Sequence, residues 1–202
     1  MSAAALVHDD YVTFCEGVRR LCDIDLLQYK RGQMERRVRS FAQRRGHDGL
    51  APYLDLLAAD VAARLDRMSR LHVREATLGD QLEPGTALVA PGGSHLRLDG
   101  TRHARLTDEA PIGGLRPRAD LTIADVAAAW GERTLLVVLT GMGRDGAQGA
   151  RAVRAAGGRV LCEAAETCTV YGMPRAVVED GLADLVLPLG ELPEAIAAEA
   201  GA

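Results

Sequence analysis

The chain has 202 residues, of which 48% are hydrophobic and 26% are charged. That balance is typical of a folded globular protein and excludes a disordered chain, while the length suits one medium domain or two small ones. The formal net charge of −4 disfavours general nucleic-acid binding. The sequence has no long apolar run, which argues against membrane insertion. The four cysteines form no CxxC pair and are expected to be reduced, so we expect a cytoplasmic protein.

The first third of the chain has the apolar spacing of helices. Apolar residues recur at i, i+4, i+7 and i+8 over residues 14–22 and again over 34–42, and a third stripe runs over 50–65. Gly46 stands where the second helix is expected to end. These stripes predict a small bundle of three helices.

After residue 66 the apolar period changes to that of an α/β sheet. Strands are predicted over 71–77, 86–90, 134–140, 157–163 and 183–189, and helices over 118–130, 145–156, 173–180 and 190–199. Residues 95–106 predict a hairpin about Asp99-Gly100. The continuous apolar run 134–140 is typical of a strand that is buried on both faces. We therefore predict a helical domain over 1–66 and an α/β domain over 67–202.

Positive charge gathers in the second predicted helix. Residues 28–45 contain seven basic side chains and one acidic side chain. On a helical wheel, a basic group lies opposite the apolar stripe and consists of Arg36, Arg37, Arg39 and Arg44. This face could bind an acidic partner through bidentate contacts, or it could simply be solvated. The pattern leaves both interpretations open.

A glycine-rich turn is the sharpest local motif. In LTGMGRDGAQG (139–149), a predicted strand runs through Gly141, Gly143 and Gly146 into a helix, and Glu163 follows 22 residues after the first of these glycines. This spacing matches a dinucleotide fingerprint, but the carboxylate of Asp145 would repel a pyrophosphate. Asp145 could instead cap the helix that follows it, or orient a catalytic histidine. All three interpretations stand at this point.

Several motifs in combination resemble the C-terminal half of the chemotaxis protein-glutamate methylesterase domain, the CheB type. They are VVLTGMGRDGAQGARAVRAAGG (137–158), TVYGMPRAV (169–177), APGGSHLRL (90–98) and the Arg-Pro-x-x-Asp run at 116–120. The resemblance implies a truncated, doubly wound, mostly parallel sheet with a hairpin. It also implies that Asp145 is the aspartate of a Ser-His-Asp triad, with Met142, Gly143 and His95 lining the same pocket.

The chain departs from the family at the other two triad positions. In the family, the nucleophilic Ser and the His precede the segment that matches 67–202, whereas the only serines and histidines before residue 67 here are Ser2, Ser40, His8 and His47, none in a strand context. Arg118 also replaces the Ser of the family's Arg-Pro-Ser motif. We therefore predict a chemotaxis protein that is catalytically incomplete.

The alternative is an active methylesterase and deamidase that hydrolyses receptor glutamyl methyl esters. Such an enzyme would complete its site with another chain or use residues outside the family pattern. Those candidates are Ser69, Ser94, His72 and His95.

Residues 11–57 resemble the all-helical N-terminal domain of chemotaxis receptor methyltransferases, the CheR type. The resemblance rests on Tyr29-Lys30, Arg36-Arg37, Gly46 and a Tyr-x-x-Leu-Leu stretch. It implies that Arg36, Arg37, Arg39 and Arg44 bind the cytoplasmic methylation helices of chemoreceptors. Other adaptation proteins or a second copy of the chain are further candidate partners. No cofactor is expected, and no His/Cys cluster has the spacing of a metal site.

Overall fold

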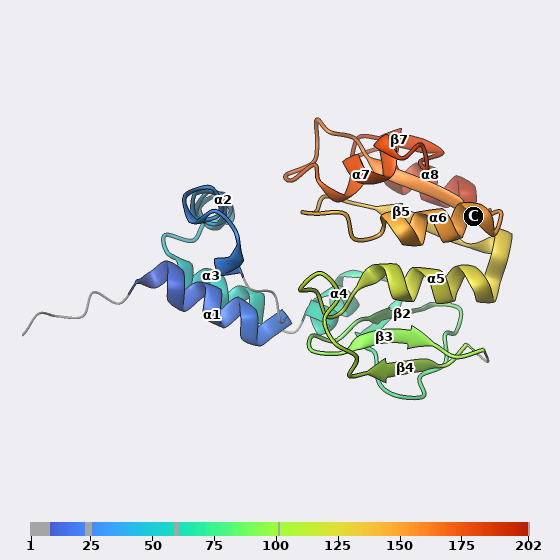
Figure 1. Cartoon of the computed structure of the whole chain (residues 1–202), viewed down its shortest axis with the longest axis horizontal. Helices are drawn as coiled ribbons and strands as arrows, with labels where there is room; N and C mark the ends of the chain where they lie inside the picture. The colour runs from blue at the N-terminus through green and yellow to red at the C-terminus, as the bar shows by residue number, and fades with distance from the viewer. Residues whose placement is uncertain (1–8, 23–25, 59–60, 101, 202) are drawn as a thin grey trace, which may run out of the picture. The chain divides into compact units, whose positions relative to one another are not determined.

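The computed structural model describes residues 9–22, 26–58, 61–100 and 102–201 (Figure 1). The described chain divides into two compact units that interleave along the sequence. The first unit contains the residues up to Ala76 together with Leu82–Ser94 and Asp108–Pro117. The second contains Thr77–Gln81, His95–Thr107 and the chain from Arg118 onward.

The first unit contains the predicted helices and a short parallel pair of strands. Its elements are α1 (Asp10–Cys22), the 3-10 helix η1 (Leu26–Gln28), α2 (Arg31–Arg44), α3 (Leu50–Ala58), α4 (Val61–Met68), β1 (His72–Glu75) and β2 (Thr86–Val89). The Asp9 carboxylate accepts the backbone N–H groups of Tyr11 and Val12 and so caps α1. Gly46 has φ +78° just after α2, which confirms the predicted end of that helix.

The third apolar stripe differs from the prediction. The stripe over 50–65 predicted one helix, whereas the structure has α3 and α4, with residues 59–60 outside the described residues. In α4 the buried side chain is Ala62, while Val61 and Leu65 are exposed. The reason is that α4 packs against β1, where the Asp66 carboxylate accepts the N–H of Val73 at 2.7 Å. The predicted first and second stripes are confirmed where their side chains are described; those of Leu21, Cys22 and Leu57 are not.

The second unit begins with the predicted hairpin. Strands β3 (His95–Leu98) and β4 (Ala104–Thr107) pair antiparallel, and α5 (Ala119–Trp130) packs against β3. Asp125 joins these elements because its carboxylate accepts Arg97 Nε at 2.6 Å and the N–H of Leu98 at 3.0 Å. At the end of α5, Trp130 is half-buried beneath the Arg102 guanidinium, 4.7 Å from the ring centre.

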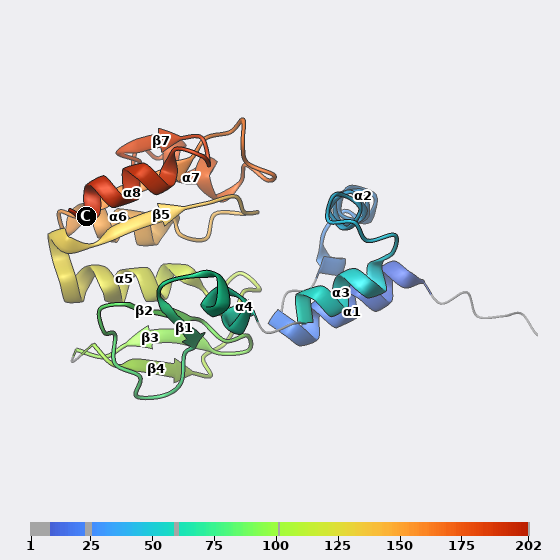
Figure 2. The ribbon, with the colours of Figure 1, turned by 180° about the vertical axis from the view of Figure 1, so that it is seen from behind.

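A three-stranded parallel sheet forms the rest of the second unit. Its strands are β5 (Leu135–Val138), β6 (Arg159–Glu163) and β7 (Leu185–Leu187), and its helices are α6 (Ala147–Ala155), α7 (Met173–Glu179) and α8 (Leu192–Ala200), with the 3-10 helix η2 (Gly131–Arg133) before β5. The strand order is β5–β6–β7, with Val138 opposite Cys162 and Cys162 opposite Val186. Figures 1 and 2 show α6 and α8 on opposite faces of this sheet. The predicted α/β class, with helices first and a parallel sheet later, is confirmed.

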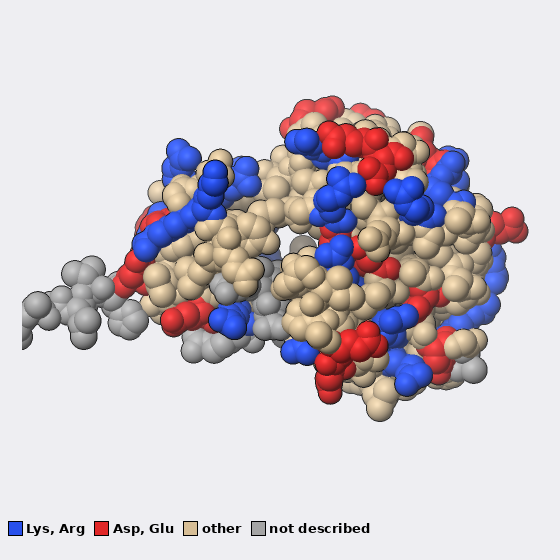
Figure 3. Space-filling model, in the orientation of Figure 1, with Lys and Arg blue, Asp and Glu red and all other residues tan. Residues whose placement is uncertain are grey.

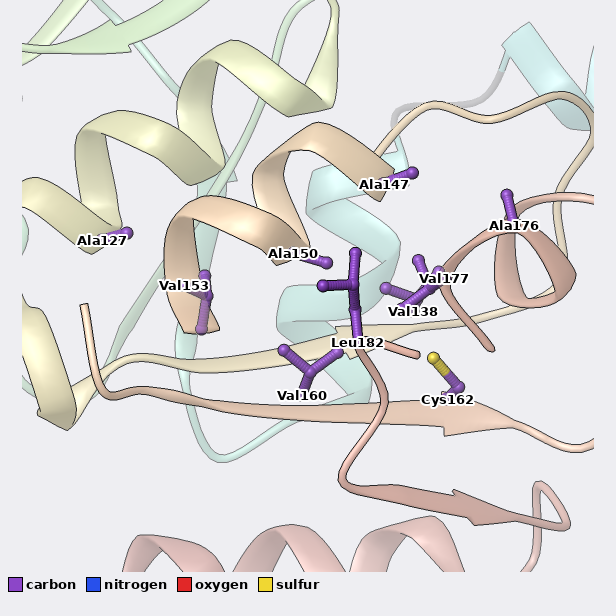
Figure 4. Close-up of a cluster of buried hydrophobic side chains, with 10 residues drawn as sticks. All are labelled: Ala127, Val138, Ala147, Ala150, Val153, Val160, Cys162, Ala176, Val177 and Leu182. Carbon is purple, nitrogen blue, oxygen red and sulfur yellow. The ribbon is translucent and has the colours of Figure 1, made fainter. Parts of the chain in front are cut away.

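The core of this unit lies between the sheet and helix α6 (Figure 4). Val160 and Cys162 of β6 and Val153 of α6 are fully buried there. The expected burial of β5 on both faces is wrong, because only Val138 of its four residues is buried. Strand β5 is at an edge of the described sheet, so neighbouring strand atoms cover it from one side only.

Candidate functional site

Asp145 lies in the turn between β5 and α6, and its carboxylate caps a different helix. Oδ2 accepts the N–H of Ala119 at 2.9 Å, and Oδ1 accepts the N–H of Asp120 at 3.0 Å, both at the start of α5. Oδ1 also accepts the N–H of Gly146 at 2.9 Å. The hypothesis that Asp145 caps the following helix is therefore wrong in its target: it stabilises the N-terminus of α5.

Arg118 completes a buried ionic network with two aspartates, which we call the aspartate clasp (Arg118, Asp120 and Asp145). Its Nε lies 3.0 Å from Asp145 Oδ1, and its Nη2 lies 2.7 Å from Asp120 Oδ2. In return, Asp120 Oδ1 accepts the N–H of Gly149 on α6 at 2.9 Å. The clasp thus joins α5 to the segment that contains α6 in both directions: Asp145, in the turn before α6, accepts backbone N–H groups of α5, and Asp120 of α5 accepts one of α6.

Gly149 lets these two helices approach closely. A Cβ at Gly149 would lie 2.7 Å from the Cβ of Ile123 on α5, which is closer than non-bonded carbon atoms approach. The short helix–helix distance brings Gly149 N–H within reach of Asp120. Sequence reasoning treated Arg118 only as a departure from a motif, although its position two residues before Asp120 was the available indication of an ion pair.

The clasp limits the acid–base chemistry of Asp145. A guanidinium stays protonated in proteins, so Arg118 cannot accept a proton as a general base. His95 is fully buried nearby, and its Nδ1 accepts the N–H of Arg118 at 3.1 Å. In a Ser-His-Asp triad, the histidine Nδ1–H instead donates to the aspartate. The structure therefore brings His95 and Asp145 to the same arginine with a hydrogen-bond polarity unlike that of a triad.

The glycine-rich loop borders an open cavity of about 230 Å³. Its lining consists of Gly143, Arg144, Tyr171, Gly172, Arg175, Ala176 and Glu179. Gly172 packs tightly on the loop, because a Cβ there would lie 2.7 Å from the carbonyl oxygen of Gly141. Met142 is half-buried in the same loop, and Gly143 has φ +84°, in the left-handed region that favours glycine. Two of the three predicted pocket residues, Met142 and Gly143, thus belong to this loop, while His95 lies against Arg118.

Glu163 corrects a second expectation from the glycine-rich motif. In a dinucleotide fingerprint the acidic residue at this spacing must reach the ligand, but Glu163 is 1% exposed. Its Oε2 accepts the N–H of Thr140 at 2.8 Å, and its backbone oxygen accepts the Cys168 thiol at 3.7 Å. Its other oxygen, Oε1, has no partner among the described residues. Glu163 therefore connects the ends of β5 and β6, and its burial removes the observation that favoured a dinucleotide site.

Two thiols near Glu163, the buried Cys162 and the half-buried Cys168, are poor nucleophiles. Burial raises the pKa of Cys162 to about 11, and Cys168 adds to that shift. The pKa of Cys168 is also raised to about 11, first by burial and then by the negative charge of Glu163. Since the thiolate is the reactive form, neither cysteine is activated at neutral pH.

The four arginines predicted to bind a receptor have different surroundings on α2. Arg39 donates to Asp10 at 2.6 Å and to Glu35 at 2.8 Å, so it joins α2 to α1. Arg36 and Arg37 are exposed, and the Arg44 guanidinium lies 4.7 Å above the ring of Phe41. Figure 3 shows basic side chains gathered over α2. Arg44 therefore flanks the predicted apolar stripe instead of lying opposite it, and the basic group divides into one internally paired arginine and three that remain at the surface.

Two negative findings apply to the part of the chain that the structure describes. No three His, Cys, Asp or Glu side chains there are grouped so that they could hold a metal ion. No described helix is long and apolar enough to span a bilayer.

The parallel sheet with helices on both faces defines an α/β domain whose candidate site lies at the carboxyl ends of its strands. A family model described as CheB methylesterase matches residues 56–196, and one described as the all-alpha domain of CheR methyltransferase matches residues 9–71. The chain belongs to the CheB methylesterase family and carries a CheR-type helical domain at its N-terminal side. Both resemblances stated for the sequence are thereby confirmed.

Several relatives named protein-glutamate methylesterase/protein-glutamine glutaminase match more than two thirds of this chain. The Symbiobacterium thermophilum protein is 47% identical over 141 residues, covering 70% of this chain and 39% of the relative. The second such protein of Pseudomonas aeruginosa is 46% identical over 142 residues, covering 69% and 41%. The crystal structure of the Thermotoga maritima CheB methylesterase catalytic domain superposes with a TM-score of 0.65 at 43% identity, covering 67% of this chain and 73% of that domain. The chain thus spans about two fifths of the length of the curated relatives it matches.

Proposed function

We propose that this protein is a chemotaxis adaptation protein that binds receptor methylation helices and is catalytically incomplete as an ester hydrolase. The single observation that carries the proposal is the set of partners around Asp145. Its carboxylate accepts three backbone N–H groups and contacts the Arg118 guanidinium. In this arrangement Asp145 stabilises a helix start rather than a catalytic imidazole.

The chemistry of ester hydrolysis explains why this matters. A triad needs a hydroxyl nucleophile, an imidazole base that takes its proton, and an aspartate that orients the imidazole. Arg118 stands where the family motif has Ser, and it brings a permanent positive charge against Asp145. Loss of the triad base or nucleophile costs several orders of magnitude in rate. The proposal is therefore that Asp145 has kept a structural role only.

The binding half of the proposal assigns receptor recognition to residues 1–66 and the methylesterase-like fold to residues 67–202. The exposed side chains of Arg36, Arg37 and Arg44 can form charge-assisted hydrogen bonds with glutamates of a receptor helix. Arg39 pairs with Asp10 and so holds the same helix, α2, against α1. The proposed partners are the cytoplasmic methylation helices of chemoreceptors.

A methanol-release assay on methyl-labelled receptor membranes tests the catalytic half of this proposal. We expect no release above buffer from the intact chain, although the chain co-sediments with the same membranes. The matched variants are Asp145→Ala and Asp180→Ala, the latter removing an aspartate whose partners are the exposed Arg144 and Arg151. Turnover that Asp180→Ala keeps and Asp145→Ala abolishes would overturn the proposal. A failure to co-sediment would overturn its binding half.

An active methylesterase or deamidase is the second candidate, and the position of His95 favours it. This imidazole is fully buried and separated from Asp145 only by Arg118 in the hydrogen-bond network. The other candidate residues are less suited, since His72 is exposed and pairs with Asp66, and Ser69 Oγ accepts the N–H of Leu71. If turnover exists, single substitutions of Ser69, Ser94, His72 and His95 discriminate a self-contained site from one completed by another chain.

A further inference from the structure

The helical segment of the first unit contains an apolar pocket that the proposed function does not use. Its volume is about 210 Å³, several times the roughly 30 Å³ that one water molecule occupies in the liquid. It is lined by Phe14, Val18, Leu26, Met34, Val38, Phe41 and Tyr53. Two of its aromatic rings, Phe14 and Tyr53, are stacked with centroids 6.0 Å apart. Such a lining is suited to an aliphatic or aromatic side chain and offers almost no polar partner.

A row of basic side chains follows one side of this pocket along α2. Lys30, Arg37 and Arg44 recur every seven residues, or about two helical turns, and all three are exposed. We call these three residues the basic edge. Each lies three or four residues from a pocket residue: Lys30 from Met34, Arg37 from both Met34 and Phe41, and Arg44 from Phe41. The Arg44 guanidinium indeed lies directly over the Phe41 ring.

The opposite side of α2 already has its counter-charges. Arg31 contacts Asp9 at 2.5 Å, and Arg39 contacts Asp10 at 2.6 Å, so these cations hold α2 against α1. Neither Lys30 nor Arg37 forms an ion pair with any residue in the described part of the chain. The cations on the pocket side of α2 can therefore pair with a binding partner, whereas those on the other side are paired with aspartates of this chain.

We propose that the pocket is the anchor site for one apolar side chain of an acidic amphipathic helix. The glutamates or aspartates of that helix would lie along the basic edge. This inference rests on the proposed function for the identity of the partner, a receptor methylation helix, and adds the feature by which the partner is selected. An apolar side chain in the pocket supplies affinity, and the charge row sets the register and speeds association at low salt. Burial of one leucine side chain strengthens binding about tenfold or more.

Fluorescence anisotropy with synthetic helices and the full chain tests the anchor. The probe is a fluorescein-labelled 21-residue helix with leucines along one face, glutamates along one flank and alanine or glutamine elsewhere. Two further versions replace the central leucine by alanine or all glutamates by lysine. The protein variants are Val38→Trp, which fills the pocket, and Ser40→Trp, which adds the same ring at an exposed position of α2 outside the pocket lining.

The expected pattern is specific to an anchored helix. Val38→Trp weakens binding of the parent probe about tenfold or more, and Ser40→Trp changes it less than twofold. The leucine-to-alanine probe binds the unchanged protein about tenfold more weakly, so the test does not depend on the folding of a variant. The lysine probe shows no saturable binding, and affinity for the parent probe falls as salt rises.

Three outcomes of the anisotropy and sedimentation experiments would overturn the inference. The first is no saturable binding of the parent probe, and the second is binding that neither Val38→Trp nor the alanine probe changes. The third is a dimer of the chain in sedimentation equilibrium that Val38→Trp dissociates, because the pocket would then hold a second copy. If receptor membranes bind the chain and the Val38→Trp variant equally, the proposed function stands and the anchor alone fails.

Discussion

Two ionic networks of this protein have nearly the same bond lengths and opposite surroundings. In the second unit, Arg118 Nη2 lies 2.7 Å from Asp120, and their side chains are 16% and 7% exposed. In the first unit, Arg39 Nη2 lies 2.6 Å from Asp10, but those side chains are 40% and 55% exposed. Water screens the exposed Arg39–Asp10 pair much more than the buried Arg118–Asp120 pair. Nearly equal distances therefore correspond to very different interaction energies. Burial, rather than bond length, therefore decides how much each network contributes to stability.

The largest expected effect is the loss of a clasp carboxylate. Asp145→Ala removes the cap of α5 and leaves Arg118 with one counter-charge fewer in a buried position. Breaking one member of a buried ionic network costs about 3–5 kcal/mol. We expect that loss in the free energy of unfolding of the second unit, measured by urea titration. Asp180→Ala, at an exposed pair, should cost about 1 kcal/mol or less. Equal losses in the two variants would contradict the contrast between buried and exposed pairs.

The second effect concerns glycines in the two units. Gly149→Ala places a Cβ 2.7 Å from Ile123, so α5 and α6 must separate. We expect a loss of about 1–3 kcal/mol, as for other overpacked sites. Gly32→Ala is the matched control, because nothing lies within 4 Å of a Cβ at that position of α2. That variant should be stabilised by about 0.4–1 kcal/mol, since alanine restricts the unfolded chain. The unfolding temperatures of the two variants provide the comparison. If Gly149→Ala were stabilised, the clasp would tolerate a larger distance between α5 and α6.

A smaller effect is expected for the exposed network. Arg39→Ala removes contacts with Asp10 and Glu35 on the surface of the helical segment. Such pairs contribute at most about 1 kcal/mol, so the midpoint of helix unfolding by circular dichroism should shift only slightly. The matched control is Arg36→Ala, because Arg36 Nε donates to the Gly32 carbonyl oxygen on its own helix, and this variant should leave the midpoint unchanged. If Arg39→Ala destabilised the protein as much as Asp145→Ala does, the exposed network would contribute as much stability as the clasp, and the contrast between the two networks would be wrong.

The smallest effect is a pH dependence of the helical segment. The hydrogen bond from Arg39 holds the pKa of Asp10 below its usual value of 3.8, and Arg31 does the same for Asp9. A carboxyl whose folded pKa is lowered stabilises the fold above its unfolded pKa and loses that contribution as pH falls through the folded value. The stability difference between the intact chain and Asp10→Asn should therefore be present at pH 6 and vanish as the pH falls below 3.8. A difference that grows on acidification would contradict the assignment of this pair.

Local patterns were sufficient for most of the secondary structure. The strand at 71–77, the hairpin about Asp99-Gly100, and the alternating strands and helices from 134 onward appear at the predicted places, within a few residues. Their positions follow from apolar periodicity, turn chemistry and glycine, all of which act over a few neighbouring residues. The stripe over 50–65 failed because α4 changes its buried face to pack on β1, and periodicity carries no information about which neighbour a helix meets.

The candidate site divides in the same way. The sequence singled out Asp145 as a carboxylate within the glycine-rich turn. It also predicted that basic side chains gather on the second helix. What Asp145 contacts was decided by folding, because Ala119 and Asp120 are 25 or more residues away along the chain. Likewise, the spacing of Glu163 in the motif did not indicate that it is buried, since only tertiary packing places Thr140 against it. Charge and spacing are properties of a segment, whereas burial and the identity of a partner belong to the packed molecule.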